Sequence, residues 1–349
     1  MSRKILGAFV AILALTEAAA AQTCTLPSVA DTVDLKQVPG SDLMTVPVEI
    51  NGTPKQFLLD IGTNPTEVSQ AAVTELGLPE NVKMLDSIQT GGTGGTSNMG
   101  GQQSQHTSVA VYDVKGGNSR EQIRTRVRIA SFTIGSATNH AMQFLVAKDV
   151  EMGKSEPYDG LMTGDFFRQY DVELDFAGKQ INYLTPTKCI DPDQVVFWSH
   201  SDVAVVPITM ADDKIQVQVL IEGHAVNAVI DTSSARTVLR RDIAELVLGF
   251  KADAPEMMSE GDLKDGMGAQ VYHHTFSKIA FAGGVTAVNV PVLISTNSLV
   301  HEAEREVVLG SKAMSAGVRI PDLELGMDVL HQLHLYAVFG QKKLYITAR

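Results

Sequence analysis

The chain is poor in several residue types that mark particular classes of protein. Its 349 residues include two cysteines and one tryptophan, and aromatic residues make up 6% of the chain. Basic residues are also scarce, because 28 lysines and arginines stand against 40 acidic residues and give a formal net charge of −12. This charge argues against nucleic acid or an anionic membrane surface as a partner.

The longest apolar run of the chain lies near the N-terminus. Arg3 and Lys4 precede an apolar stretch at 5–15, which is too short for a transmembrane helix of ~20 residues, and alanines follow at 19–21. This order predicts a secretory signal at residues 1–21, whose removal changes the net charge from −12 to −13. We therefore expect an exported protein, periplasmic or secreted, without a membrane span.

The two cysteines, Cys24 and Cys189, leave room for a single disulfide in an oxidising compartment. Such a bond would close a long loop and restrict the unfolded chain. Two free thiols are the alternative, because a sequence does not show how far apart two Cα atoms lie. The residues before Cys24 lack the pattern of a lipoprotein signal, so a lipid anchor is not expected.

The chain consists of two similar halves. In each half, an apolar segment ends at a glycine, and a second apolar segment ends at an aspartate eight positions after that glycine. A threonine follows the aspartate by six positions in both. The equivalent pairs are Gly52 and Gly223, Asp60 and Asp231, and Thr66 and Thr237. This pattern predicts two strands joined by a turn, with the aspartate at the end of the second strand.

Short helices and closing hairpins are predicted in each half. Ser69 can cap a helix at 70–76, and its counterpart is expected at 240–248. Residues 165–181 match 328–344 at a constant offset of 163, and both segments end in a predicted hairpin. Alternation at 171–176 predicts that its acidic residues form a solvated face.

These patterns predict a mostly β protein with two units of ordinary domain size, at 22–190 and 191–349. A pseudo-two-fold axis between the units would bring Asp60 and Asp231 together over one water molecule. Two carboxyl groups so close share a proton, so that one acts as a base toward the water and the other as an acid toward a carbonyl. Hydrolysis of an amide then needs no metal or cofactor.

The turns after the two aspartates carry a resemblance to a known family. They read Asp60-Ile61-Gly62-Thr63 and Asp231-Thr232-Ser233-Ser234. These turns are similar to the Asp-Thr-Gly-Ala and Asp-Ser-Gly turns of retropepsin-like aspartic proteases, and 162–167 and 325–330 resemble the strand and helix that close each family lobe. The resemblance covers 46–346 and implies two tandem closed β-barrel lobes with a cleft between them. It also implies an aspartic endopeptidase that cleaves peptides or unfolded proteins.

In that family a glycine-rich hairpin covers the cleft. Gly91, Gly92, Gly94 and Gly95 lie where this flap would fall. A disordered surface loop is the alternative interpretation, since glycine permits many conformations. The internal two-fold favours a monomer that closes one site within one chain over a homodimer.

Two positions depart from the family pattern. Ile61 replaces the hydroxyl residue that would bond across to the other lobe, although Thr232 retains its hydroxyl, and Ser233 replaces a glycine. These departures leave a second hypothesis open, a catalytically degenerate lobe pair that binds peptides or proteins without cutting them. A zinc site at His331 and His334 is not expected, because no third ligand lies nearby in the sequence.

Overall fold

A computed structural model describes the chain at residues 26–61, 66–87, 121–147, 157–167, 170–186, 189, 195–199, 203–211, 214–251, 257–265, 267–297 and 321–348. Most of these residues form β-strands, as the sequence predicts. The predicted secretory signal lies outside the described residues, as do Cys24, Gly62, Thr63 and the four flap glycines.

The first half of the chain forms a closed six-stranded barrel, called lobe 1 here. A pairing between β3 and β7 closes the ring. In order around the barrel the strands are β3 (Met44–Ile50), β4 (Thr53–Asp60), β9 (Gly160–Thr163), β5 (Glu67–Ser69), β8 (Ala137–Ala147) and β7 (Glu121–Ile134). Strands β2 (Lys36–Gln37) and β6 (Glu80–Ser87) extend its edges.

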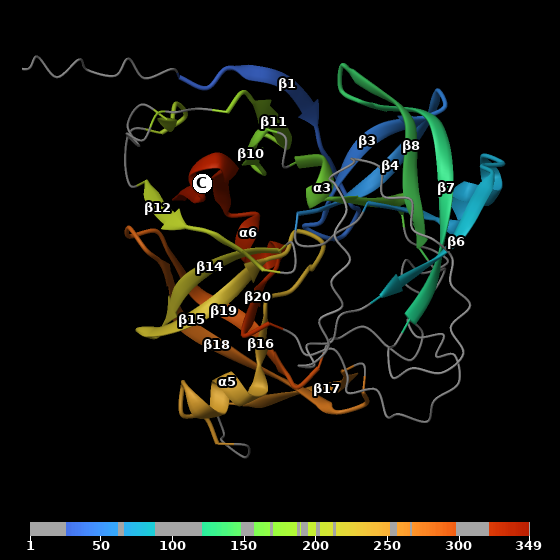
Figure 1. The fold of residues 1–349 in the computed structure, drawn as a ribbon. Coiled ribbons are helices and arrows are strands. Elements are labelled where there is room, and N and C mark those ends of the chain that lie inside the picture. The colour runs from blue at the N-terminus through green and yellow to red at the C-terminus, as the bar shows by residue number, and fades with distance from the viewer. Residues whose placement is uncertain are drawn as a thin grey trace, which may run out of the picture.

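The second half repeats this barrel as lobe 2, and a pairing between β14 and β18 closes it. The strands are β14 (Lys214–Ile221), β15 (His224–Ile230), β20 (Leu323–Leu325), β16 (Val238–Arg240), β19 (Thr286–Ser295) and β18 (Gln270–Phe281). Strands β13 (Thr209–Ala211) and β17 (Met258–Lys264) lie at its edges. Figure 1 shows lobe 1 on the right and lobe 2 at the lower left.

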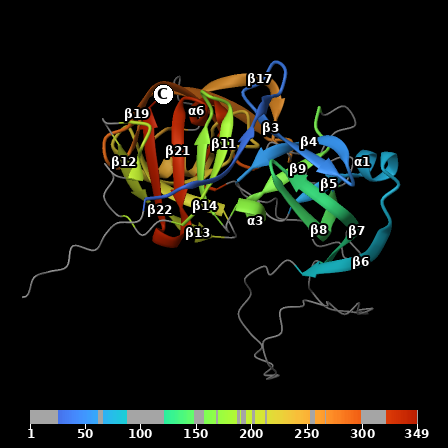
Figure 2. The ribbon, with the colours of Figure 1, turned by 90° about the horizontal axis from the view of Figure 1, so that it is seen from above.

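A third, six-stranded sheet joins the two halves. Its order is β1 (Val29–Asp34), β11 (Gln180–Leu184), β10 (Asp171–Asp175), β21 (Leu333–Val338), β22 (Lys343–Ala348) and β12 (Ala204–Pro207). The first three strands come from the first half of the chain and the last three from the second. They meet where β10 pairs with β21, with Val172 opposite Ala337. Figure 2 shows β11, β21 and β22 beside one another, with the lobe 1 strands to their right.

The turns and helices follow from local sequence. The β3–β4 turn places Asn51 and Gly52 at φ 51° and 80°, and the β14–β15 turn places Glu222 and Gly223 at φ 48° and 88°. Positive φ at both central positions suits the twist of a two-residue hairpin, and it requires residues such as Asn and Gly. The two predicted hairpins are therefore confirmed.

Helix α1 (Gln70–Glu75) begins as predicted, because the Ser69 hydroxyl accepts a hydrogen bond from the Ala72 N–H at 3.0 Å. Its counterpart α5 spans Arg241–Leu246. The short helices α3 (Gly164–Phe167) and α6 (Met327–Leu330) follow β9 and β20, and a 3-10 turn, η2, spans Phe339–Gln341.

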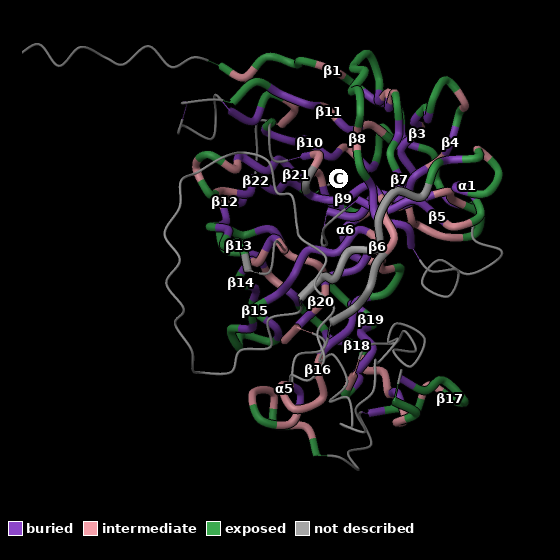
Figure 3. The backbone as a smooth tube through the Cα atoms, turned by 45° about the vertical axis from the view of Figure 1, so that its right-hand side comes forward, coloured by how far each residue is buried: buried purple, intermediate pink, exposed green. Residues whose placement is uncertain are grey.

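The prediction that the acidic residues of β10 form a solvated face is wrong. Asp171 and Glu173 are each 2% exposed, and buried residues run through β10 and β21 in Figure 3. Glu173 accepts hydrogen bonds from Asn182 Nδ2 at 3.0 Å and from His334 Nε2 at 2.7 Å. The Trp198 ring stacks on His334 with centroids 4.2 Å apart, so a segment between the lobes covers a face that alternation alone would leave to solvent.

Candidate active site

Asp60 and Asp231 occupy equivalent strand ends in the two lobes. Asp60 is the last residue of β4, and Asp231 directly follows β15. Their exposed fractions are 1% and 7%. Each strand pairs in parallel with the strand that precedes a short helix, β9 in lobe 1 and β20 in lobe 2. The Asp231 N–H also donates to the Leu325 carbonyl of β20 at 3.0 Å, which holds the end of the strand in place.

The Thr232 hydroxyl connects the two strand ends across the lobes. It donates to the Leu59 carbonyl at 2.8 Å and accepts from the Ile61 N–H at 3.1 Å. Leu59 and Ile61 flank Asp60, and Thr232 directly follows Asp231. Both bonds are buried, so this hydroxyl fixes the separation and orientation of the two aspartate-bearing backbones.

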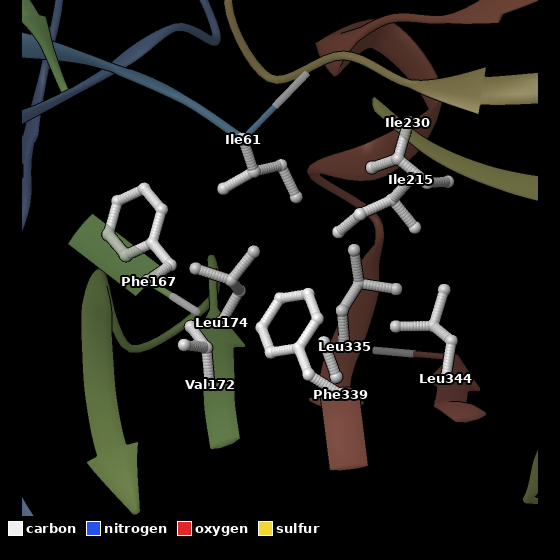
Figure 4. A pocket seen from close by; sticks show the side chains of 10 residues that line it. Ile61, Phe167, Val172, Leu174, Ile215, Ile230, Leu335, Phe339 and Leu344 are labelled. Atoms are coloured by element: carbon white, nitrogen blue, oxygen red, sulfur yellow. The ribbon is translucent and has the colours of Figure 1, made fainter. Parts of the chain in front are cut away.

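Ile61 fills the place of the missing second hydroxyl with an apolar contact. Its side chain is 6% exposed and lines a cavity of ≈ 10 Å³ at the junction of both lobes and the joining sheet. Figure 4 shows Ile61 pointing toward Leu174 and Phe167, with Ile230 on the lobe 2 side. An isoleucine therefore stabilises the lobe junction by burial, where a threonine would do so by hydrogen bonding.

Ser233 turns toward the carboxylate that it follows. Its N–H and hydroxyl donate to Asp231 Oδ1 at 2.9 Å and 2.7 Å, and the Ser234 N–H donates to the same oxygen at 3.2 Å. The side chain that replaces glycine thus adds a donor to the carboxylate. Three donors on one oxygen fix the orientation of the carboxyl group.

The turn of each lobe is supported by the threonine six positions after its aspartate. In lobe 2, Thr237 Oγ1 accepts from the Gly326 N–H at 3.1 Å and donates to Asp328 at 2.6 Å. In lobe 1, Thr66 Oγ1 accepts from the Thr163 N–H at 3.3 Å. Gly326 is required sterically, since a Cβ there would lie 2.5 Å from the Arg236 carbonyl carbon.

Asp328 lies in the first turn of α6, but its side chain does not bond to its own helix there. Its carboxylate accepts from the Thr237 N–H at 2.9 and 3.0 Å. The N-cap of α6 is Gly326, and the helix has no side-chain cap. Asp328 therefore ties α6 to the turn that carries Asp231.

Glu324 is a site residue that sequence reasoning missed. It lies in the middle of β20 and is partly buried. Burial raises its pKa to about 8, with the negative charge of Asp231 as the next cause and that of Asp60 as a smaller one. A hydrogen bond with the Ser234 side chain and the Lys214 charge act in the opposite direction. The sequence feature that could have identified Glu324 is an acidic residue between two leucines in a short, otherwise apolar strand.

Other predicted features are only partly described. Cys189 is 2% exposed, but its partner Cys24 lies outside the described residues, so the disulfide stays a prediction. Among the described residues, no three His, Cys, Asp or Glu side chains gather as a metal site would require. In the same residues, no helix is both long and apolar enough to cross a bilayer.

Two closed barrels, a shared six-stranded sheet and one aspartate at the same strand end of each barrel define the two-lobed fold of the retropepsin-like aspartic proteases. Residues 217–329 match the family model of aspartyl proteases, and this match covers most of lobe 2.

Similar solved structures include two plant seed globulins. The crystal structure of conglutin gamma, a basic 7S globulin from lupine seeds, has 11% sequence identity and a TM-score of 0.46, over 93% of this chain and 95% of that one. The soybean basic 7S globulin has 11% identity and a TM-score of 0.42, over 92% and 95%. No curated protein sequence matches the chain.

Proposed function

We propose that the protein is an aspartic endopeptidase that hydrolyses peptide bonds with a water molecule held between Asp60 and Asp231. The observation that carries the proposal is the Thr232 hydroxyl, which bonds to both neighbours of Asp60 while following Asp231 in the chain. The aspartyl protease match to lobe 2 supports the same conclusion.

The chemistry follows from two carboxyl groups that share one proton. The ionised group takes a proton from the water as the water oxygen bonds to the carbonyl carbon, and the protonated group gives its proton to the carbonyl oxygen. When the tetrahedral intermediate collapses, the carbon–nitrogen bond breaks and the leaving nitrogen takes a proton from the protonated carboxyl group. The other carboxylate takes the proton of one hydroxyl of the intermediate, so the pair again holds one proton. The three donors on Asp231 Oδ1 hold the carboxyl group of lobe 2 in one orientation.

The substrate in this proposal is a peptide or an unfolded protein, and one chain supplies both carboxyl groups. The flap would be the glycine-rich run that contains Gly91, Gly92, Gly94 and Gly95. The protein would act in the periplasm or outside the cell after its signal segment is removed, as a monomer.

A second candidate function is peptide or protein binding without cleavage. Ile61 favours it, because its side chain is committed to the apolar junction and supplies no hydroxyl toward Thr232. Only one of two reciprocal contacts then positions the carboxyl groups, and a displacement of ~1 Å is enough to lower the rate of a reaction severely.

The two functions separate in one experiment. The protein is incubated with an unfolded protein from acid to neutral pH, with and without pepstatin, alongside Asp60→Asn and Asp231→Asn. Asp262→Asn, at an exposed position of β17, is the matched control. Pepstatin-sensitive cleavage that is lost in both dyad variants and kept in the control supports the endopeptidase. Intact substrate at every pH, together with measurable peptide binding, supports the binding module.

A further inference from the structure

The side chain of Glu324 lies on the outer face of lobe 2, the face that carries Asp231. In β20 the neighbouring Leu323 and Leu325 are fully buried in the barrel core. Successive strand residues point to opposite faces, so Glu324 points out of the barrel. Its parallel partner in β15 is Val229, and Asp231 follows Val229 by two positions on the same face.

Lys214 belongs to the same face. Gln216 of β14 lies opposite Val229 of β15, and continuing this antiparallel register by two positions brings Lys214 opposite Asp231. The core-facing residues of β14 are Ile215 and Val217, which places Lys214 on the outer side with Glu324. The two side chains also interact electrostatically, so Asp231 has an acidic and a basic residue beside it.

Lobe 1 has leucines at both equivalent positions. In β4 and β9, Leu58 pairs with Leu161 as Val229 pairs with Glu324. Thr45 lies opposite Leu58, and the same two-position continuation brings Leu43 opposite Asp60. Asp60 in lobe 1 therefore has apolar neighbours, and Asp231 in lobe 2 has charged ones. The strand registers around the two aspartates are otherwise equivalent.

We propose that Glu324 is a specificity-determining residue, which selects a lysine or arginine next to the scissile bond on the lobe 2 side, while Leu43 and Leu161 select an apolar residue on the lobe 1 side. This inference rests on the proposed peptide-binding cleft and names its substrate class. Glu324 is partly exposed on the outer face of β20, the face that carries Asp231, so a ligand bound on that face can contact it.

A substrate cation fits the charge balance around Glu324. Among the described residues, the negative charges of Asp231 and Asp60 and the positive charge of Lys214 act on this carboxyl group. Burial and the two acids disfavour its ionised form, so its pKa rises to about 8. A lysine or arginine of the substrate would supply the missing positive charge and form a charge-assisted hydrogen bond. An apolar residue of the same length would leave the carboxyl group without that partner.

The test uses peptides of one sequence that carry either lysine or norleucine at the residue on each side of the cleaved bond. For the wild-type protein we expect kcat/KM to favour lysine by about tenfold on one side only. Glu324→Leu should abolish this preference, and Glu324→Gln should reduce it. Lys214→Met should strengthen it, because a competing cation is removed.

Leu161→Glu is the matched variant in lobe 1, and it should create a preference for lysine on the opposite side of the bond. If the wild type and Glu324→Leu both cleave the lysine and norleucine peptides equally well, the inference about Glu324 is overturned, while the proposed endopeptidase activity is supported. If no peptide is cleaved, the proposed endopeptidase activity is refuted instead. The same peptide pairs are then compared by binding affinity to Asp60→Asn, with and without Glu324→Leu, and an unchanged affinity ratio would overturn the inference there too.

Discussion

The cross-lobe contact of Thr232 predicts a large effect of removing one oxygen atom. Thr232→Val keeps the branched shape of the side chain, so the change introduces neither a cavity nor a clash. It removes the donor to the Leu59 carbonyl at 2.8 Å and the acceptor for the Ile61 N–H at 3.1 Å. Both bonds are buried, so the substitution leaves two buried backbone groups without this partner.

The magnitude follows from the cost of leaving buried polar groups unpaired. Each such group costs ~1–3 kcal/mol, so two of them predict a loss of ~2–6 kcal/mol in the free energy of unfolding. Thr232→Ser keeps the hydroxyl and should lose ~1 kcal/mol or less through its missing methyl group. Cleavage should fall as well in Thr232→Val, because the spacing of the two carboxyl groups is no longer fixed.

Urea unfolding followed by tryptophan fluorescence measures this loss. The single tryptophan, Trp198, stacks on His334 of the joining sheet, so its emission reports the packing of that sheet. Thr133→Val is the control, because its hydroxyl bonds only to Thr138 in an exposed hairpin and its loss should stay within ~0.5 kcal/mol. A Thr232→Val midpoint equal to that of the control, at equal slope, would refute the structural role of the hydroxyl.

Three further predictions concern stability. The raised pKa of Glu324 means that the folded protein binds a proton more tightly than the unfolded chain, so stability falls as pH rises from about 4.5 to about 8. In urea, Glu324→Gln should therefore unfold at a higher midpoint than the wild type at pH 9 and at the same midpoint at pH 4. Equal midpoints at pH 9 would contradict this. Glu173→Leu should lower the free energy of unfolding in urea by about 3 kcal/mol, because His334 loses a buried acceptor at 2.7 Å. An unchanged free energy would show that a buried leucine is as stable there as the paired acid. Gly326→Ala should lose about 2 kcal/mol or more in thermal unfolding because its Cβ would meet backbone at 2.5 Å, while Gly340→Ala, with nothing within 4 Å, should lose less.

The repeat made the barrel hairpins and the aspartate positions predictable. Both turns need two residues at positive φ, and Asn51-Gly52 and Glu222-Gly223 supply glycine at the same offset from the aspartate. The Ser69 cap is equally local. Features that depend on a few adjacent residues occur in both halves of this chain. The second occurrence supports the structural assignment that the first one alone would leave ambiguous.

The joining sheet was not predictable in the same way. Alternation along β10 separates its two faces correctly, but it does not show whether the polar face meets water or protein. That outcome depends on Trp198 and His334, which come from segments far from β10 in sequence. The acidic residues are buried because both halves contribute strands to one sheet, and a period-2 pattern contains no information about that assembly.

Glu324 escaped prediction for a related reason. A leucine–glutamate–leucine strand fits a half-exposed edge as well as it fits a strand beside the proposed catalytic aspartate, and the parallel pairing with β15 distinguishes the two. Once the register is known, the comparison with Leu161 is immediate, because both residues pair with the position two before the aspartate.

The two lobes place different side chains on equivalent strand positions. Lobe 1 has the apolar residues Ile61, Leu43 and Leu161 there, while lobe 2 has the polar residues Thr232, Lys214 and Glu324. A symmetric pair of lobes would present the same chemistry on both sides of a bound peptide, and it could not define the direction in which the peptide lies. In the proposed cleft the apolar and charged sides would define that direction, and such a site would need two unlike halves more than two equal ones.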